Sequence, residues 1–169
     1  EGKDATFLRA DHAHYAFVSE QIMQILLKYV DISKFEQTSI DEAFLNITEK
    51  TKGDYFKAKD LAQRIKKEIL EKIKLTCSVG IGPNKLIAKI ASTQAKPNGL
   101  TIVKDNEVEN FLRYMEVDSI PGVGGKTREA LEAMSVRTIS DLRSIDPVIL
   151  VEKFGKKTGN FFYQASRGI

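Results

Sequence analysis

The sequence has one cysteine, two histidines and no tryptophan among its 169 residues. A single thiol, Cys77, excludes a disulfide within the chain, and His12 and His14 stand too far from it for a zinc-binding spacing. We interpret Cys77 as a small buried apolar residue. No apolar run approaches the roughly 18 residues of a membrane span, and residues 1–10 lack a signal-peptide pattern. We therefore expect a cytoplasmic protein with no membrane partner.

An excess of one charge is also lacking. The formal net charge is +3, with 16 basic and 13 acidic residues before Lys104 and 10 of each from there on. This balance does not by itself predict a nucleic-acid-binding protein, so any site for a polyanion must come from a local arrangement of residues.

Hydrophobic periodicity predicts alternating helices and strands over the first 82 residues. Apolar residues recur every three or four positions over 12–29, as in an amphipathic helix. Two short strands follow over 34–39 and 42–48, separated by a link short enough for a hairpin. A second helix follows Gly53, and 75–82 (LTCSVGIG) then alternates strictly between larger and small residues.

This order of elements predicts an α+β fold. Helix, strand, strand, helix, strand is the split βαβ (ferredoxin-like) arrangement with its first strand absent, and we expect that strand to lie upstream of Glu1. The start at Glu1 without a methionine and the end at RGI also lead us to expect a piece of a longer protein.

A change of character near Lys104 predicts two domains. Pro83 suits the first turn of a helix that the Lys-Pro-Asn-Gly cluster at 96–99 ends, and 100–103 is an expected edge strand. Beyond it, short helices are punctuated by glycine and proline. We expect an α+β portion over 1–103 and a small all-α portion over 104–169.

Two adjacent carboxylates, Asp41 and Glu42, stand at the tip of the expected hairpin in SIDEAFLNIT. On a regular strand they would point to opposite faces, but at a tip they can converge. Convergent carboxylates suit Mg²⁺ when substrate phosphates and water complete its shell, and two such ions can stabilise a displacement at phosphorus. Alternatively, the acids of a turn are merely solvated.

Two further features favour a phosphate site beside this pair. The small face of LTCSVGIG, formed by Thr76, Ser78 and Gly80, leaves room for a ligand or another backbone. Downstream, Lys85 and Lys89 share one helical face, and Lys96 continues nearly the same stripe. The alternative for the lysines is a solvated helix face.

A glycine-rich turn in SIPGVGGKTREALEAM predicts a helix-hairpin-helix. Pro121, Gly122, Val123 and Gly124 precede a helix that starts near Lys126, and such a turn exposes backbone N–H groups to a phosphate. The alternative is an ordinary turn between helices. A looser second version of the pattern spans 152–165.

Together, SIDEAFLNIT, TCSVGIGPNKLIAKIAS, QAKPNG and IPGVGGKT resemble, in order and spacing, the Y-family lesion-bypass DNA polymerases of the DNA polymerase IV type. The resemblance implies a palm with a split βαβ sheet over 1–103 and a helical thumb with helix-hairpin-helix turns over 104–169. It implies a DNA-directed DNA polymerase that uses two Mg²⁺ ions, primer-template DNA and a dNTP. A sliding clamp is a further partner, through regions absent here.

The resemblance also implies roles for particular residues. Asp41 resembles the palm carboxylate that binds the catalytic metals, and Glu42 the neighbour that binds the metal near the primer 3′-hydroxyl. Lys96 resembles the lysine that contacts the incoming triphosphate, and Lys85 and Lys89 match further positions of the same nucleotide site. The expected DNA-backbone contacts lie in the turn and the start of the next helix: Pro121, Gly122, Val123, Gly124, Gly125, Lys126 and Thr127.

The sequence departs from this family by what is missing. The first metal-binding aspartate, the steric gate, the fingers and the little finger have no counterpart, so we expect the 169 residues alone to be inactive. Asn46 stands where the family often has aspartate. A rival hypothesis is a non-catalytic helix-hairpin-helix module that binds DNA, and a third is an unrelated palm-like cyclase, which would need no hairpin turns.

Overall fold

The computed structural model describes residues 6–169, so the first five residues of the predicted 1–103 portion lie outside the described part. Its first portion alternates helices and strands, as the periodicity predicts. The elements are α1 (His12–Leu27), the 3₁₀ helix η1 (Ile32–Lys34), β1 (Phe35–Gln37), β2 (Ala43–Leu45), α2 (Thr48–Thr51), α3 (Tyr55–Ile73), β3 (Val79–Ile81), α4 (Lys85–Thr93) and β4 (Leu100–Ile102).

The strands form two separate two-stranded sheets. β1 pairs antiparallel with β2, with Phe35 opposite Leu45, and β3 pairs parallel with β4, with Val79 opposite Leu100. Within residues 6–169 no ladder joins β2 to β3. The expected order of elements is therefore present, but its four strands pair as two half-sheets.

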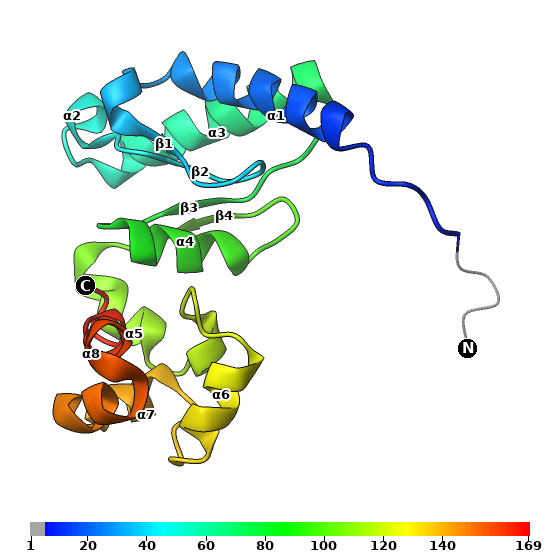
Figure 1. Ribbon diagram of the computed structural model, residues 1–169. Coiled ribbons are helices and arrows are strands. Elements are labelled where there is room, and N and C mark those ends of the chain that lie inside the picture. Colours follow the sequence, from blue (N-terminus) through cyan, green and yellow to red (C-terminus); the bar gives the residue numbers. More distant parts are fainter. Residues whose placement is uncertain (1–5) are drawn as a thin grey trace.

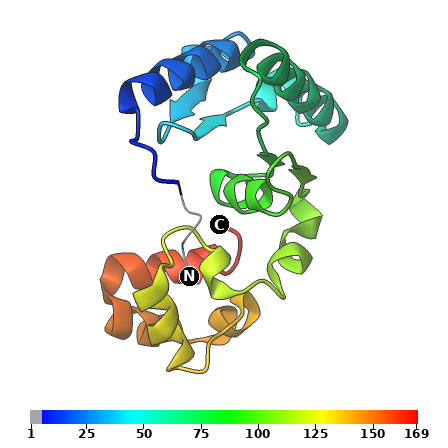
Figure 2. The ribbon, with the colours of Figure 1, turned by 90° about the vertical axis from the view of Figure 1, so that its right-hand side faces the viewer.

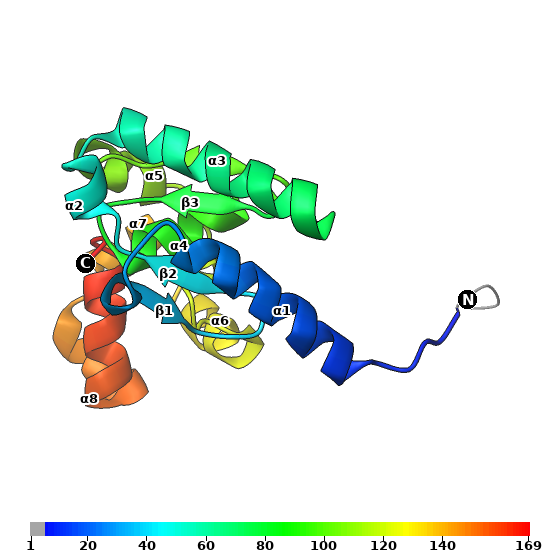
Figure 3. The ribbon, with the colours of Figure 1, turned by 90° about the horizontal axis from the view of Figure 1, so that it is seen from above.

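Helices α1 and α3 cover one face of both half-sheets (Figures 1 and 3). The apolar stripe of α3 packs on α1, on Leu45 of β2 and on Cys77, while Ala58 and Ala62 pack on β3 and β4. Asp54 caps α3 by accepting from the amide of Phe56 at 2.8 Å. One helix thus holds the two half-sheets in a common layer.

A carboxylate also joins α1 to α3. Glu68 of α3 accepts from Lys28 Nζ at 2.7 Å, Tyr29 Oη at 2.6 Å and Lys72 Nζ at 2.6 Å. The hydrogen bonds from Lys28, then Lys72 and Tyr29, lower the pKa of Glu68 to about 2.

The segment LTCSVGIG differs from its prediction in two ways. Only Val79–Ile81 is a strand, because β4 pairs with just these residues, and Cys77, which we expected to be buried, is only partly buried. The room beside Gly80 is filled by the backbone of α4. A Cβ there would collide with the Ala88 carbonyl, so the space that Gly80 leaves serves helix packing and not a ligand.

The second portion is all-helical, as predicted. Its elements are η2 (Asp105–Glu107), α5 (Val108–Leu112), η3 (Val117–Ser119), α6 (Gly125–Glu132), α7 (Ile139–Ser144) and α8 (Pro147–Ala165). A capping box of Thr138 and Asp141 starts α7, and Asp146 caps α8. Gly155, at φ +80°, interrupts α8 within the looser glycine pattern. None of the helices among residues 6–169 is long and apolar enough to cross a membrane.

Helix α4 belongs to both portions. Beside β3 it meets Gly80, while Ile87, Ile90 and Ala91 are fully buried in the core of the helical portion. Figures 1 and 2 show α4 between the sheet layer and the helices that follow. The core of the helical portion thus extends across Lys104, near which we expected the domain boundary.

Candidate active site and nucleic-acid interface

The predicted carboxylate pair lies at the tip of the β1–β2 hairpin. The amides of Thr38 and Ser39 donate to the Glu42 carbonyl at 3.0 and 3.3 Å, which closes the turn ahead of β2. The Asp41 carboxylate is exposed and accepts from Ser39 Oγ at 2.7 Å. Asp41 and Glu42 therefore lie in the turn between Gln37 and Ala43, the pair that closes the hairpin ladder. Strict strand alternation does not apply there.

A buried serine anchors this tip to α1. Ser19 has 6% of its surface exposed, and its hydroxyl donates to the carbonyl of Ile40. A polar side chain on the buried stripe of an amphipathic helix is the sequence signal that could have predicted this contact. Ser19 was not among the site residues predicted from the sequence.

Two predicted lysines of α4 meet acidic residues of the hairpin. Lys89 Nζ pairs with Glu42 Oε1, and Lys85 Nζ pairs with Glu36 Oε2 while lying 5.8 Å from the centre of the Phe44 ring. The structure thus brings the lysine face of α4 to the carboxylate tip. In this state Glu42 is neutralised by a lysine, and Asp41 is held by its own turn.

Lys96 does not continue this lysine stripe, contrary to the sequence prediction. α4 ends at Thr93, and Lys96 lies exposed in the turn that leads to β4. In this turn Gly99 packs against Ala95, a contact that leaves no space for a Cβ. Lys96 is therefore placed by a loop and not by helical periodicity.

The donor set at the tip fits a hard cation only in part. Carboxylate oxygens are the ligands that Mg²⁺ prefers. Yet nowhere in residues 6–169 do three His, Cys, Asp or Glu side chains gather as a metal site would require. Asp41 and Glu42 can supply oxygen ligands, but the remaining ligands must come from elsewhere.

The predicted glycine turn lies between η3 and α6. Ile120 and Val123 are buried beneath it, while Gly122 and Gly124 are exposed at its surface. Gly122 has φ +93°, a conformation that favours glycine, and Gly124 is the N-cap of α6 with no side-chain cap. The first amides of α6 therefore have no intrahelical acceptor, and they belong to exposed residues, Gly125 and Lys126, and to the half-buried Thr127. The first helix of the motif is only the three-residue η3.

An arginine behind the turn ties it to its helix. Arg128 of α6 contacts Asp118 of η3 at 2.5 Å, Glu116 at 3.1 Å and Glu132 at 2.9 Å. These carboxylates, Glu132 first, raise the pKa of Arg128. This cluster was not predicted from the sequence, because Glu116 and Asp118 lie in a different segment from Arg128 and Glu132 of α6.

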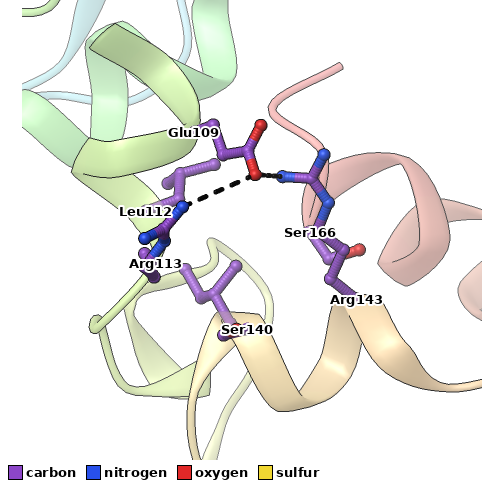
Figure 4. Close-up of a pocket in the computed structure, with 7 residues that line it drawn as sticks. Glu109, Leu112, Arg113, Ser140, Arg143 and Ser166 are labelled. Carbon is purple, nitrogen blue, oxygen red and sulfur yellow. Dashed lines mark ion pairs between the residues drawn. The ribbon is translucent and has the colours of Figure 1, made fainter.

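A small hollow between α5, α7 and α8 lies elsewhere in the helical portion. It is lined by Glu109, Leu112, Arg113, Ile139, Ser140, Arg143 and Ser166. Figure 4 shows Glu109 between two arginines, with Arg143 at 3.2 Å and Arg113 at 3.9 Å. This charge cluster is internally paired and belongs to the packing of the three helices.

Comparison with known proteins gives matches along the chain. Residues 2–93 match the impB/mucB/samB family, and residues 118–169 match the thumb domain of DNA polymerase iota. DNA polymerase IV of Nitrosopumilus maritimus is 47% identical over the whole chain, and that of Methanosarcina acetivorans is 45% identical over 98% of it. The chain spans 46% of the length of each of these relatives.

Solved structures show the same likeness. DinB of Sulfolobus solfataricus superposes on 97% of the chain with a TM-score of 0.89 at 35% identity, and the chain covers 48% of it. The insertion ternary complex of Dbh DNA polymerase superposes on 99% with a TM-score of 0.91, again at 35% identity and covering 48% of that chain. The α+β portion and the helical portion therefore correspond to the palm and thumb of such enzymes, and the chain belongs to the impB/mucB/samB family of Y-family, DinB-type DNA polymerases.

Proposed function

We propose that this chain supplies the palm and thumb of a translesion DNA polymerase of the cytoplasm. The parent enzyme would transfer a nucleotide from a dNTP to a primer 3′-hydroxyl, directed by a template and dependent on Mg²⁺. The observation that carries the proposal is the meeting of the Asp41 and Glu42 tip with the lysine face of α4, in a fold that superposes on 99% of the chain with a polymerase ternary complex.

The role proposed for each site residue follows from its position. Asp41 and Glu42 would hold the catalytic metal ions, and Mg²⁺, when bound, would stabilise the attacking and leaving oxygens of the displacement. Lys96, in its exposed turn, would contact the triphosphate, with Lys85 and Lys89 on the neighbouring helix face adding positive charge. Gly122, Gly124 and the amides around Lys126 would bind DNA phosphates, which positions the duplex without reading its sequence.

The division of the four strands into two half-sheets is the reason to include a further strand in the proposal. A strand between β2 and β3 would pair with both inner edges and lie under α1 and α3, beside the carboxylate tip. We propose that this palm strand carries the third metal-binding carboxylate. The 169 residues alone would then be inactive, and a clamp would bind through regions outside them.

Primer extension by the parent enzyme tests this assignment. Asp41→Asn and Glu42→Gln remove a ligand charge with little change of shape, and each should lower the extension rate by at least about a hundredfold while leaving primer-template affinity within about twofold. Asp31→Asn, on an exposed loop residue that caps no helix through its side chain, is the matched control and should extend normally. Normal extension by both tip variants would refute the catalytic proposal.

The alternative function is a non-catalytic module that binds DNA through the exposed glycine turn. It is favoured by the pairing of Glu42 with Lys89, which leaves that carboxylate engaged without any metal. It predicts salt-dependent duplex binding by the 169-residue chain that falls with changes at Gly122 or Gly124 and persists without Asp41 and Glu42. A parent protein that binds DNA but never extends a primer would favour this alternative.

A further inference from the structure

A lysine of α3 reaches into the base of the turn that carries Lys96. Lys66 Nζ donates to the Cys77 carbonyl, to Asn98 Oδ1 at 2.7 Å and to the Gly99 carbonyl at 3.1 Å. An ammonium group has three N–H donors, and each finds one acceptor here. Lys66 thus joins the segment before β3 to the end of the turn before β4.

The same turn end is fixed from the other side. The Gly99 amide donates to Ser78 Oγ at 3.1 Å, and the Gly99 carbonyl also accepts from the Val79 amide at 3.0 Å. Gly99 packs so closely on Ala95 that a Cβ would not fit. The exposed residues between these fixed points include Lys96, so the position of Lys96 depends on where this turn end is held.

We propose that Lys66 is a positioning residue for nucleotide binding, which holds the turn so that Lys96 can meet the triphosphate. The proposal rests on the proposed function, because it assumes that Lys96 contacts the nucleotide. Lys66 itself is not a phosphate ligand, since its three donors are engaged with backbone and amide oxygens. Charge-assisted hydrogen bonds to backbone carbonyls suit this task, because they constrain the main chain directly.

The first test is nucleotide insertion by the parent polymerase. Lys66→Met keeps most of the aliphatic stem and removes the donors, and it should raise the KM for the dNTP about tenfold with kcat and primer-template affinity within about twofold. Lys66→Arg, which retains donors, should recover part of the loss. Lys67→Met is the matched control, because the neighbouring Lys67 is exposed and pairs only with Glu71, at 3.7 Å, among the described residues.

A double variant at Lys66 and Lys96 distinguishes a positioning role of Lys66 from a general loss of stability. Lys66→Met should add little to the KM increase of Lys96→Ala, because both remove the same contact. Asn98→Ala, which removes one acceptor without changing α3, should raise KM in the same direction by a smaller factor. The proposal would be overturned if the KM increases of Lys66→Met and Lys96→Ala multiplied fully in the double variant. It would also be overturned if Lys66→Met and Asn98→Ala had the same KM as the control Lys67→Met.

Amide hydrogen exchange in the 169-residue chain gives a readout that needs no activity. Lys66→Met should speed exchange at Gly99 at least about tenfold relative to Lys67→Met, because the turn end loses its clamp. Unchanged exchange at Gly99 would overturn the inference whatever the enzyme does. A wild-type parent that does not extend primers would instead refute the proposed function, with the exchange result still deciding whether Lys66 holds the turn.

Discussion

Lys89 of α4 pairs with Glu42 at the tip of the β1–β2 hairpin, although the two residues are 47 positions apart in the sequence. The pair is partly exposed, with 28% of the Lys89 side chain and 40% of the Glu42 side chain accessible. A carboxylate proposed as a metal ligand is thus engaged by an internal cation. Any metal ion at the tip must compete with this ammonium group.

Removing the lysine should therefore strengthen metal binding at the tip. Lys89→Met in the 169-residue chain should raise the affinity for Mn²⁺, used as a probe, by about two- to fivefold, the size expected for a partly exposed ion pair. Calorimetric titration would measure it. Lys85→Met is the control, because it removes an equal charge from the same helix face but frees Glu36 instead. An equal gain in both variants would contradict a specific role for the Lys89–Glu42 pair.

Gly80→Ala should destabilise the fold. Its Cβ would overlap the Ala88 carbonyl and the Ser92 amide, which are backbone atoms of α4 and cannot turn aside. Overpacking of this kind costs about 1–3 kcal/mol, and urea unfolding would measure the loss in the free energy of unfolding. Gly125→Ala, at an open position at the start of α6, should leave that free energy unchanged or slightly raised. Similar stability of Gly80→Ala and wild type would show that α4 can move away from β3.

The acid dependence of stability should include a contribution from Glu68. Its pKa is about 2 in the folded protein against an ordinary value of 4.5, because Lys28, Lys72 and Tyr29 stabilise the charged carboxylate. The contribution is fully present above pH 4.5 and is lost as the pH falls towards 2. Glu68→Gln should flatten this part of the stability profile, measured by urea unfolding at several pH values. Glu71→Gln, which removes a single contact at 3.7 Å, should keep the wild-type slope.

Local periodicity predicted the elements whose stability comes from one buried face. The stripe of Leu61, Ile65 and Ile69 gives α3 as expected, because one apolar face suffices to specify an amphipathic helix. The β1–β2 hairpin was likewise correct, and it places Asp41 and Glu42 at its tip. The family resemblance, which depends on these motifs, is confirmed.

What the sequence did not predict depends on contacts between distant elements. The end of α4 at Thr93 removes Lys96 from the lysine stripe, and the α4 backbone fills the space that Gly80 offered to a ligand. Neither outcome can be read from spacing, because a small residue leaves the same gap for a helix as for a substrate. The contact of Lys66 with backbone carbonyls leaves no mark in a hydrophobic pattern, and the contact of Ser19 is marked only by a polar residue on a buried stripe.

Arg128→Met should loosen the glycine turn by releasing three carboxylates on one guanidinium. Without the arginine, Glu116, Asp118 and Glu132 repel one another and η3 loses its tie to α6. We expect a lower free energy of unfolding than in the wild type at 50 mM salt and a smaller difference at 500 mM, because these charges are exposed enough to be screened. Arg113→Met should lower the free energy of unfolding less at either salt concentration, because its partner Glu109 lies 3.9 Å away and still pairs with Arg143. Unfolding in urea measures both, and amide exchange at Val123 shows whether the turn itself has loosened. A salt-independent loss in Arg128→Met would mean that its aliphatic stem, and not its charge, holds the turn.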